Sequence, residues 1–176
     1  MARILVTGGA GYIGSHTAVE LMQQGYDVTI VDNLSNSNVD VLDGITAIVG
    51  RRPEFANIDC NDFVNLDSVF RQYPDIVGVI HFAASKAVGE SVQKPLLYYR
   101  NNIGSLITLL EVMKRHQVQN IVFSSSCTVY GQPDKAHLPV DETAPIQKAL
   151  SPYGNTKQIN EDIIRDEAHA DTNLHA

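Results

Sequence analysis

The chain has 176 residues and a formal net charge of −7, with 44% hydrophobic and 19% charged residues. This usage is typical of a globular domain, and the length suits one domain with a sizeable core. The negative charge argues against nucleic acid or an anionic membrane as a partner. The sequence shows no apolar run long enough to cross a bilayer, and its first residues enter a strand directly, so we expect no signal peptide.

The cysteines and histidines indicate neither a metal site nor a disulfide framework. Cys60 and Cys127 lack metal-ligand and C-x-x-C spacing, and we interpret them as reduced thiols, with Cys127 packed, which favours the cytoplasm. The six histidines form no metal-binding motif. His81 lies within an apolar strand, so we expect a core histidine there.

The first elements predict a nucleotide-binding βαβ unit. An apolar strand over 3–7 is followed by glycines at 8, 11 and 14, a helix over 16–22, and a second strand over 27–31 that ends at Asp32. Such glycines let the backbone turn tightly and approach a pyrophosphate, which lies at the helix N-terminus. A carboxylate at the end of the second strand can bond a ribose 2′-hydroxyl and repels a 2′-phosphate, so NAD is preferred over NADP.

The rest of the chain continues the alternation of strand and helix. In order, the pattern predicts a polar loop to Asn38, a helix over 41–49, a strand over 54–58, a helix over 62–73, a buried strand over 76–82, a long helix over 95–116, a strand over 120–123 and a loop over 131–150. This order predicts an α/β fold with a doubly wound parallel sheet of the Rossmann type, helices on both faces, and a ligand where the two halves meet.

Tyr153 and Lys157 follow Pro152, which suits the first position of a helix. Four residues apart, they share one helix face, about 6 Å apart along the axis. A nearby ammonium favours the phenolate and lowers the tyrosine pKa, which makes Tyr153 a usable base. Alone, this motif is more often a surface pair, but the glycine turn and the serine run over 124–126 favour redox chemistry at a sugar or alcohol carbon.

Six segments together resemble the UDP-glucose 4-epimerase group of the extended short-chain dehydrogenase/reductase family. They are residues 7–16, 32–34, 81–84, 86–91, 124–131 and 151–157. The similarity runs through essentially the whole chain. Ser85 is a small departure, because the family usually carries a larger residue there.

The resemblance implies NAD-dependent inversion of C4 of a UDP-hexose through a transient 4-keto sugar. Tyr153 is the implied base for the sugar 4-hydroxyl, Lys157 holds the nicotinamide ribose, and Ser126 bonds the 4-oxygen. Implied cofactor contacts are Gly8, Gly11, Tyr12, Ile13, Gly14, Asp32, Asn33, Leu34, Ser35, Asn36, Ser37, Asp59, Cys60, Phe82, Ala83, Ala84, Ser85, Lys86, Asn101, Tyr153 and Lys157. Implied substrate contacts are Lys86, Ser126 and Tyr153, and no metal is implied.

Several alternatives stay open. Ser124 and Ser125 can be strand-end hydroxyls that bond backbone, Asn101 can be a polar residue on an exposed helix turn, and Glu90 can be an acid at a helix N-terminus. A nucleotide-sugar dehydratase or decarboxylase is another activity, but these enzymes commonly place an acid directly after the catalytic serine, where this chain has Cys127. A fragment that binds NAD without turnover is the third alternative.

The family resemblance also bears on domain organisation and assembly. Members continue for another domain's worth of sequence, so we expect residues 1–176 to be an incomplete NAD-binding domain that ends near the start of a sixth strand, without the C-terminal substrate lobe. The resemblance further implies a homodimer through the helix over 95–116 and the helix after Tyr153. These two helices carry further apolar residues, which either widen the apolar surface available to a second subunit or are buried against the sheet only. They are Leu109, Val112, Ile159 and Ile163.

Overall fold

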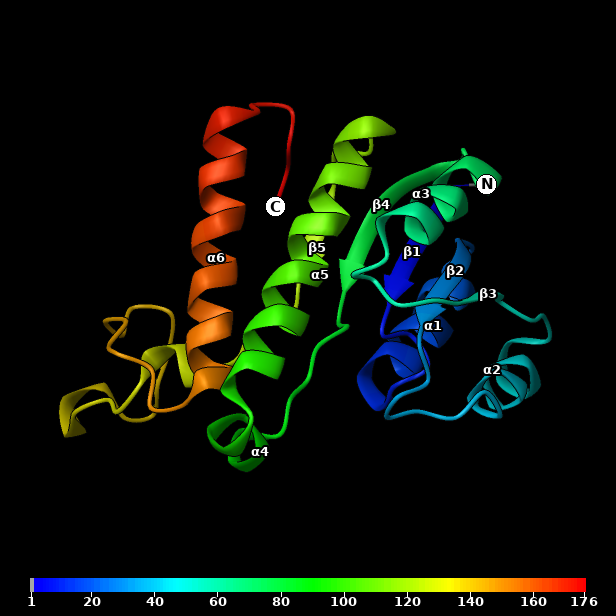
Figure 1. The fold of residues 1–176 in the computed structure, drawn as a ribbon. Helices are drawn as coiled ribbons and strands as arrows, with labels where there is room; N and C mark the ends of the chain where they lie inside the picture. The colour runs from blue at the N-terminus through cyan, green and yellow to red at the C-terminus, as the bar shows by residue number, and fades with distance from the viewer. Residues whose placement is uncertain (1) are drawn as a thin grey trace.

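The computed structural model describes residues 2–176 and confirms the predicted doubly wound sheet (Figure 1). All strand pairs are parallel, and the strand order is β3-β2-β1-β4-β5. The strands are β1 (Arg3–Thr7), β2 (Asp27–Asp32), β3 (Glu54–Asn57), β4 (Ile76–His81) and β5 (Ile121–Phe123). The chain builds outward from β1 to β3, then crosses back to β4, so the strand order reverses between β1 and β4. Ligands of such sheets bind beyond the carboxyl ends of the strands at this point.

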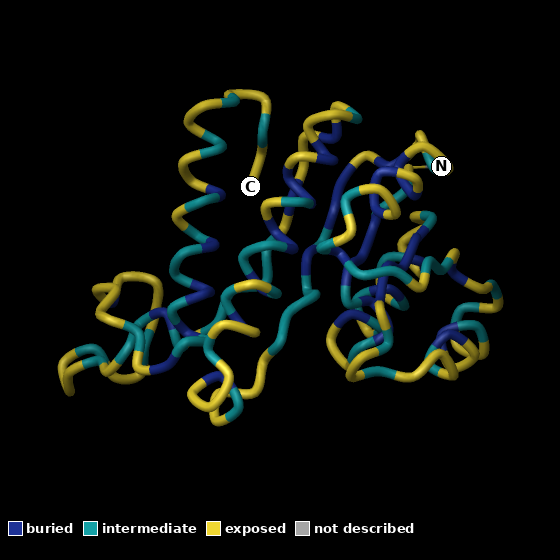
Figure 2. The backbone as a smooth tube through the Cα atoms, viewed as in Figure 1, coloured by how far each residue is buried: buried dark blue, intermediate teal, exposed yellow. Residues whose placement is uncertain are grey.

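Helices cover both faces of the sheet. They are α1 (Tyr12–Gln23), α2 (Val41–Val49), α3 (Phe63–Gln72), α4 (Val88–Gln93), α5 (Pro95–Arg115) and α6 (Pro152–Ala170). Side chains of a strand point alternately to opposite faces. Accordingly, Val6 packs with residues of α1 and α2, whereas its neighbour Leu5 packs with residues of α3, α5 and α6. Figure 2 shows this buried centre along the strands and the exposed outer faces of the helices.

Two helices differ from the sequence prediction. The helix predicted over 16–22 begins earlier, at Tyr12, directly after Gly11 in an extended conformation. Its first turn was missed because Tyr12 and Ile13 are exposed and add nothing to the apolar pattern. The short helix α4 was not predicted, and Glu90 lies in its first turn, as the helix-acid interpretation proposed.

The two long helices pack side by side (Figure 1). Leu109 and Val112 of α5 are fully buried in the core of this chain. The interpretation that these two residues widen an exposed stripe for dimerisation is therefore wrong: they bury inside the chain, as the alternative held. Ile159 and Ile163 of α6 are only partly buried.

The last residues return to the sheet beside β5. A parallel bridge pairs Asn120 with His175, and the Ile121 amide donates to the His175 carbonyl at 2.9 Å. This is the position where the sequence predicted a sixth strand to begin. Among residues 2–176, no helix combines the length and apolar character needed to cross a membrane.

Candidate active site at the carboxyl edge of the sheet

The glycine turn between β1 and α1 is packed too closely for side chains. Gly8 has a φ of +67°, and a Cβ there would lie 2.8 Å from the Ala83 backbone nitrogen. A Cβ on Gly14 would overlap the Gly8 carbonyl. The turn therefore presents bare backbone to the edge of the sheet, followed by the first turn of α1, whose N–H groups lack helical partners. Bare backbone at a helix N-terminus suits a pyrophosphate, and the contacts expected from Gly8, Gly11, Tyr12, Ile13 and Gly14 stay a prediction.

Asp32 ties the glycine turn to the loop after β2. The residue is 9% exposed, and its carboxylate accepts from the Ala10 amide at 3.1 Å, the Leu34 amide at 2.9 Å and the Ser37 hydroxyl at 2.8 Å. Leu34 adopts a φ of 56° in this loop. Asp32 therefore holds the loop in place in addition to the ribose contact predicted for it, and this second task was missed from the sequence. The other predicted contacts of the loop are surface residues: Asn33, Ser35 and Asn36.

Asp59 and Cys60 follow β3 and differ in orientation. Burial alone would raise the pKa of Asp59, but hydrogen bonds from Asn61 and Asn33 outweigh it and hold the pKa below its usual value. The Cys60 thiol lies in the core, where burial, with the charges of Asp59 and Asp32, raises its pKa to about 12. A thiol so buried packs, so only the backbone of Cys60 is available to a cofactor.

The loop after β4, residues 82–86, is clamped by two adjacent asparagines of α5. Asn101 donates to the Ser85 hydroxyl at 2.9 Å. Asn102 accepts from the Ser85 amide at 2.8 Å and donates to the Ser85 carbonyl at 3.0 Å and to the Thr156 hydroxyl at 3.0 Å. Asn101 is therefore a partner of the loop and not a free surface residue, and Lys86, next along the chain, is exposed.

Sequence reasoning missed Asn102, although it is the more buried of the two asparagines, with 1% of its surface exposed. A usable signal exists: Asn102 lies four residues before Leu106, on the apolar face of the helix. A polar residue at such a position needs buried hydrogen-bond partners.

Tyr153 and Lys157 share the first turns of α6. The helix begins at Pro152, and the Ser151 hydroxyl caps it by accepting from the Gly154 amide at 3.1 Å. Tyr153 is half-buried, whereas Lys157 is 3% exposed. The Lys157 Nζ donates to the Ser124 carbonyl at 2.7 Å and lies 4.6 Å from the centroid of the Phe123 ring. Burial lowers the pKa of Lys157 to about 8, against a smaller opposing effect of Glu161.

Ser126 is held beside the start of α6. Its hydroxyl oxygen accepts from the Thr128 amide at 3.3 Å and the Thr128 hydroxyl at 3.0 Å, which leaves its own proton free for another oxygen. The 3₁₀ turn that follows, Cys127–Tyr130, packs on α6: Gln158 donates to the Val129 carbonyl at 2.7 Å, and a Cβ on Gly154 would lie 3.2 Å from the Thr128 carbonyl.

The neighbours of Ser126 correct two expectations. The Ser125 hydroxyl donates to the Glu161 carboxylate and not to backbone. Cys127 was expected to pack, but it is exposed at the first position of the 3₁₀ turn.

His81 is a core residue, as predicted. Its Nδ1 lies 2.7 Å from the Thr7 hydroxyl, and its ring stacks on Phe123. Burial, and secondarily the charge of Lys157, lower the pKa of His81 to about 3, so the ring is neutral. In the described part of the chain, residues 2–176, no three His, Cys, Asp or Glu side chains form a group that could hold a metal ion.

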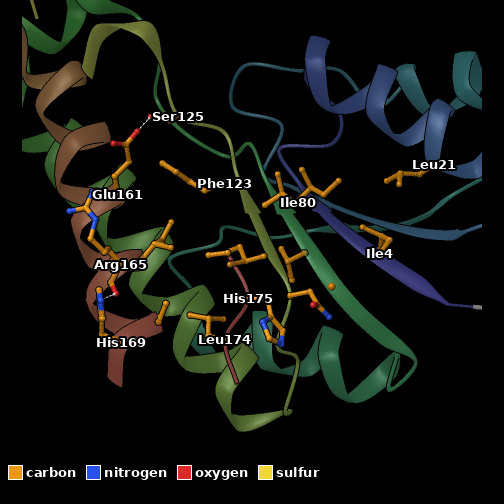
Figure 3. A pocket seen from close by; sticks show the side chains of 18 of the residues that line it. Ile4, Leu21, Ile80, Phe123, Ser125, Glu161, Arg165, His169, Leu174 and His175 are labelled. Carbon is orange, nitrogen blue, oxygen red and sulfur yellow. Dashed lines mark hydrogen bonds between the residues drawn. The ribbon is translucent and has the colours of Figure 1, made fainter. Parts of the chain in front are cut away.

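A hollow of about 1090 Å³ lies elsewhere, on the sheet face beside β5 (Figure 3). Ile4, Ile80 and Phe123 line it from the strands, and Glu161 and Arg165 line it from α6. None of the residues predicted to contact cofactor or substrate belongs to its lining. The candidate site at the carboxyl edge of the sheet is therefore separate from this hollow.

Curated relatives match nearly the whole chain. A UDP-glucose 4-epimerase, uge1, of Schizosaccharomyces pombe is 51% identical over 175 residues, which cover 98% of this chain and 49% of the relative. The human UDP-glucose 4-epimerase is 48% identical over 180 residues, and the aligned region covers 99% of this chain and 51% of the relative. The chain thus spans about half the length of the curated relatives it matches.

Solved structures agree with the fold. The UDP-glucose 4-epimerase of Bifidobacterium longum in complex with NAD+ and UDP has a TM-score of 0.93 at 46% identity, covering 97% of this chain and 50% of its own. A Stenotrophomonas maltophila UDP-glucose-4-epimerase with bound NAD and formylated UDP-arabinopyranose also has a TM-score of 0.93 at 46% identity, covering 99% of this chain and 51% of its own. The model of the NAD dependent epimerase/dehydratase family matches residues 4–176, and the chain therefore belongs to that family.

Proposed function

We propose that residues 1–176 form the NAD-binding domain of a UDP-hexose 4-epimerase. The observation that carries this proposal is the placement of Tyr153 and the buried Lys157 on one helix, with Ser126 held beside them, at the sheet edge that also carries the glycine turn. The names of the relatives support the substrate class, UDP-glucose or UDP-galactose.

The residues at this edge divide into those that hold the cofactor and those that move protons. The glycine turn holds the pyrophosphate on backbone N–H groups, and Asp32 and loop 33–37 meet the adenosine ribose. Asp59 and the backbone of Cys60 lie on the adenine side, and residues 82–86 with Asn101 complete the set of cofactor contacts. NAD, when bound, would supply the hydride acceptor for the sugar carbon C4 and the hydride donor for the return step.

The proton chemistry belongs to the chain itself. Tyr153 takes the proton of the sugar 4-hydroxyl and later gives it back, while Lys157, one helical turn further along α6, holds the nicotinamide ribose. The Ser126 hydroxyl proton is not used by Thr128, and Ser126 donates it to the sugar 4-oxygen. Lys86 is exposed at the end of its loop and contacts the substrate. Inversion of C4 would require the 4-keto sugar to turn over in the site before Tyr153 returns the proton.

We also propose that the protein is cytoplasmic and forms a homodimer along α5 and α6. Exposed apolar residues of α5 support a dimer: Leu96 is 77% exposed and Ile107 is 41% exposed. The free thiols of Cys60 and Cys127 support a reducing compartment. Light scattering at micromolar concentration should give twice the chain mass, and a strictly monomeric mass would contradict the dimer.

The test measures NAD binding and epimerisation separately. The chain should bind NAD in a calorimetric titration, and conversion of UDP-galactose should be followed both for the chain alone and for the chain fused to the remaining half of a relative. We expect the fusion to be active, the chain alone to turn over negligibly, and Tyr153→Phe in the fusion to lower turnover by about 10²-fold. Tyr26→Phe, away from the site, is the matched control. An active fusion in which Tyr153→Phe has unchanged kinetics contradicts the assignment.

A further inference from the structure

A line of hydrogen-bonded side chains crosses the carboxyl edge of the sheet. Asn33, after β2, donates to the Asp59 carboxylate at 3.0 Å. Asn61 donates to the same carboxylate at 2.9 Å and to the Asn101 side-chain oxygen at 3.0 Å. Asn101 donates to the Ser85 hydroxyl at 2.9 Å. The loops after β2, β3 and β4 are therefore joined side chain to side chain.

Asn61 is the joint in this line. The two protons of its amide nitrogen serve two elements, Asp59 after β3 and Asn101 on α5. The helix makes room for it: a Cβ on Gly104 would lie 2.5 Å from the Asn61 side-chain oxygen. Asp59 does not depend on this side chain alone, because it also accepts from the Asn61 backbone amide at 2.8 Å. Asn101 loses its connection to the β3 loop when the carboxamide is removed.

The far end of the line reaches the catalytic helix. Asn102 holds both backbone groups of Ser85 and donates to the hydroxyl of Thr156, which itself donates to the Tyr153 carbonyl at 2.7 Å. The Ser85 loop is thus fixed to α6 on one side, through Asn102, and to the adenosine-side loops on the other, through Asn101 and Asn61.

We propose that Asn61 is a positioning residue for the cofactor: its carboxamide holds the adenosine-side loops and the Ser85 loop in register, so that both halves of the dinucleotide meet groups already in place. The proposal rests on the proposed function, in which this edge binds NAD. Loops that are ordered before binding lose less conformational freedom when the ligand arrives, which favours affinity for a ligand that contacts all of them.

The first test compares a whole ligand with half of one. Calorimetric titrations with NAD and with AMP are made on the wild-type chain, on Asn61→Ala and on Asn65→Ala. Asn65 is the matched control, an asparagine whose amide donates only locally, to Asp62 at 2.7 Å. One neutral hydrogen bond corresponds to roughly a fivefold change in affinity. We expect Asn61→Ala to weaken NAD about fivefold or more and AMP less than about twofold, with both ligands unchanged in Asn65→Ala.

The second test uses Gly104→Ala, whose methyl group would displace the Asn61 carboxamide. This change should weaken NAD in the wild-type background and have no further effect in Asn61→Ala, because the clash is then gone. Additive effects, equal weakening of NAD and AMP, or an unchanged NAD affinity in Asn61→Ala overturn the proposal while leaving NAD binding established. A wild-type chain that binds no NAD overturns the proposed function, and the positioning role with it.

Discussion

Lys157 provides the sharpest test of the site, because the chain buries a cation there at a cost to its own stability. The side chain is 3% exposed and has its pKa lowered from 10.5 to about 8 by burial. Lys157→Met keeps an unbranched apolar stem and removes the charge. The variant should therefore gain stability relative to the wild type, and the gain should depend on pH.

The sign and size follow from linkage. In the unfolded chain the lysine keeps its proton up to about pH 10.5, whereas in the folded chain it releases the proton near pH 8. The penalty for the buried ammonium is therefore fully present below pH 8, fades between pH 8 and 10.5, and is gone above that. A shift of this size corresponds to about 3 kcal/mol at neutral pH, at about 1.4 kcal/mol per pKa unit.

The assay is urea unfolding followed by far-UV circular dichroism at several pH values between 7 and 10.5. Other groups titrate in this window, notably Cys60, Tyr73 and Tyr98, whose raised pKa values make both proteins lose stability at high pH. Their effects cancel in the difference between variant and wild type. That difference should shrink by about 3 kcal/mol from pH 7 to pH 10.5.

Lys114→Met is the control. Lys114 is an exposed lysine that pairs with Glu167, and this pairing raises its pKa, so its difference curve should be nearly flat and slope the opposite way. If the Lys157→Met difference stays constant across the window, the ammonium is not buried as the structure places it, and the reasoning fails.

Three further predictions concern two residues of the candidate site, Asp32 and Gly14, and the buried Asp67 of α3. Asp32→Ala should raise the affinity for NADP relative to NAD in titrations. The change also removes a carboxylate that accepts three hydrogen bonds, so it should lower the unfolding free energy by about 3 kcal/mol. Unchanged urea unfolding would contradict the second effect. Gly14→Ala should abolish NAD binding and cost about 1–3 kcal/mol of stability, because its Cβ overlaps a backbone carbonyl; calorimetry with NAD decides. Asp67, buried against His116, Arg71 and Arg115, has its pKa lowered first by the hydrogen bond with His116, so Asp67→Asn should lower the melting temperature at pH 7. A carboxyl group whose pKa is lowered by folding contributes its full stability above its unfolded pKa of 3.8, and loses it as the pH falls through the lower folded pKa. The difference between Asp67→Asn and the wild type should therefore disappear as the pH falls below 3.8, and a difference that persists in acid refutes the ion-pair account.

The centre of the sheet was predictable because β1, β2 and β4 are short, largely buried apolar runs, which the sequence pattern identifies directly. Strands β1, β2 and β4 match the predicted ranges to within a residue at each end. The sequence did not predict α4, which has no buried apolar stripe. This helix is six residues long and exposes Val88 and Val92, so its sequence shows no helical spacing of buried apolar residues. Local pattern identifies an element when its neighbours bury one face of it for several turns.

The same limit explains the error on α5. Apolar spacing shows that Leu109 and Val112 belong on an apolar surface, but it does not show what covers that surface. In the structure α5 packs against the sheet, α3 and α6, and these three contacts bury most of its wide apolar surface within the chain. A wide stripe thus predicts several neighbours, and whether one of them is a second subunit depends on the topology.

The candidate site divides along a similar line, between residues with a motif and residues that support them. Tyr153, Lys157 and the glycines follow fixed spacings, whereas Asn61 and Asn102 matter because distant loops bring partners to them. Asn102 shows a buried carboxamide with partners on both its oxygen and its nitrogen, which makes it a stable part of the scaffold. Lys157 is different, since the described residues offer one hydrogen-bond acceptor to its three N–H groups. Under the proposed function, the bound cofactor supplies acceptors to the N–H groups of Lys157 that the described residues leave without a partner.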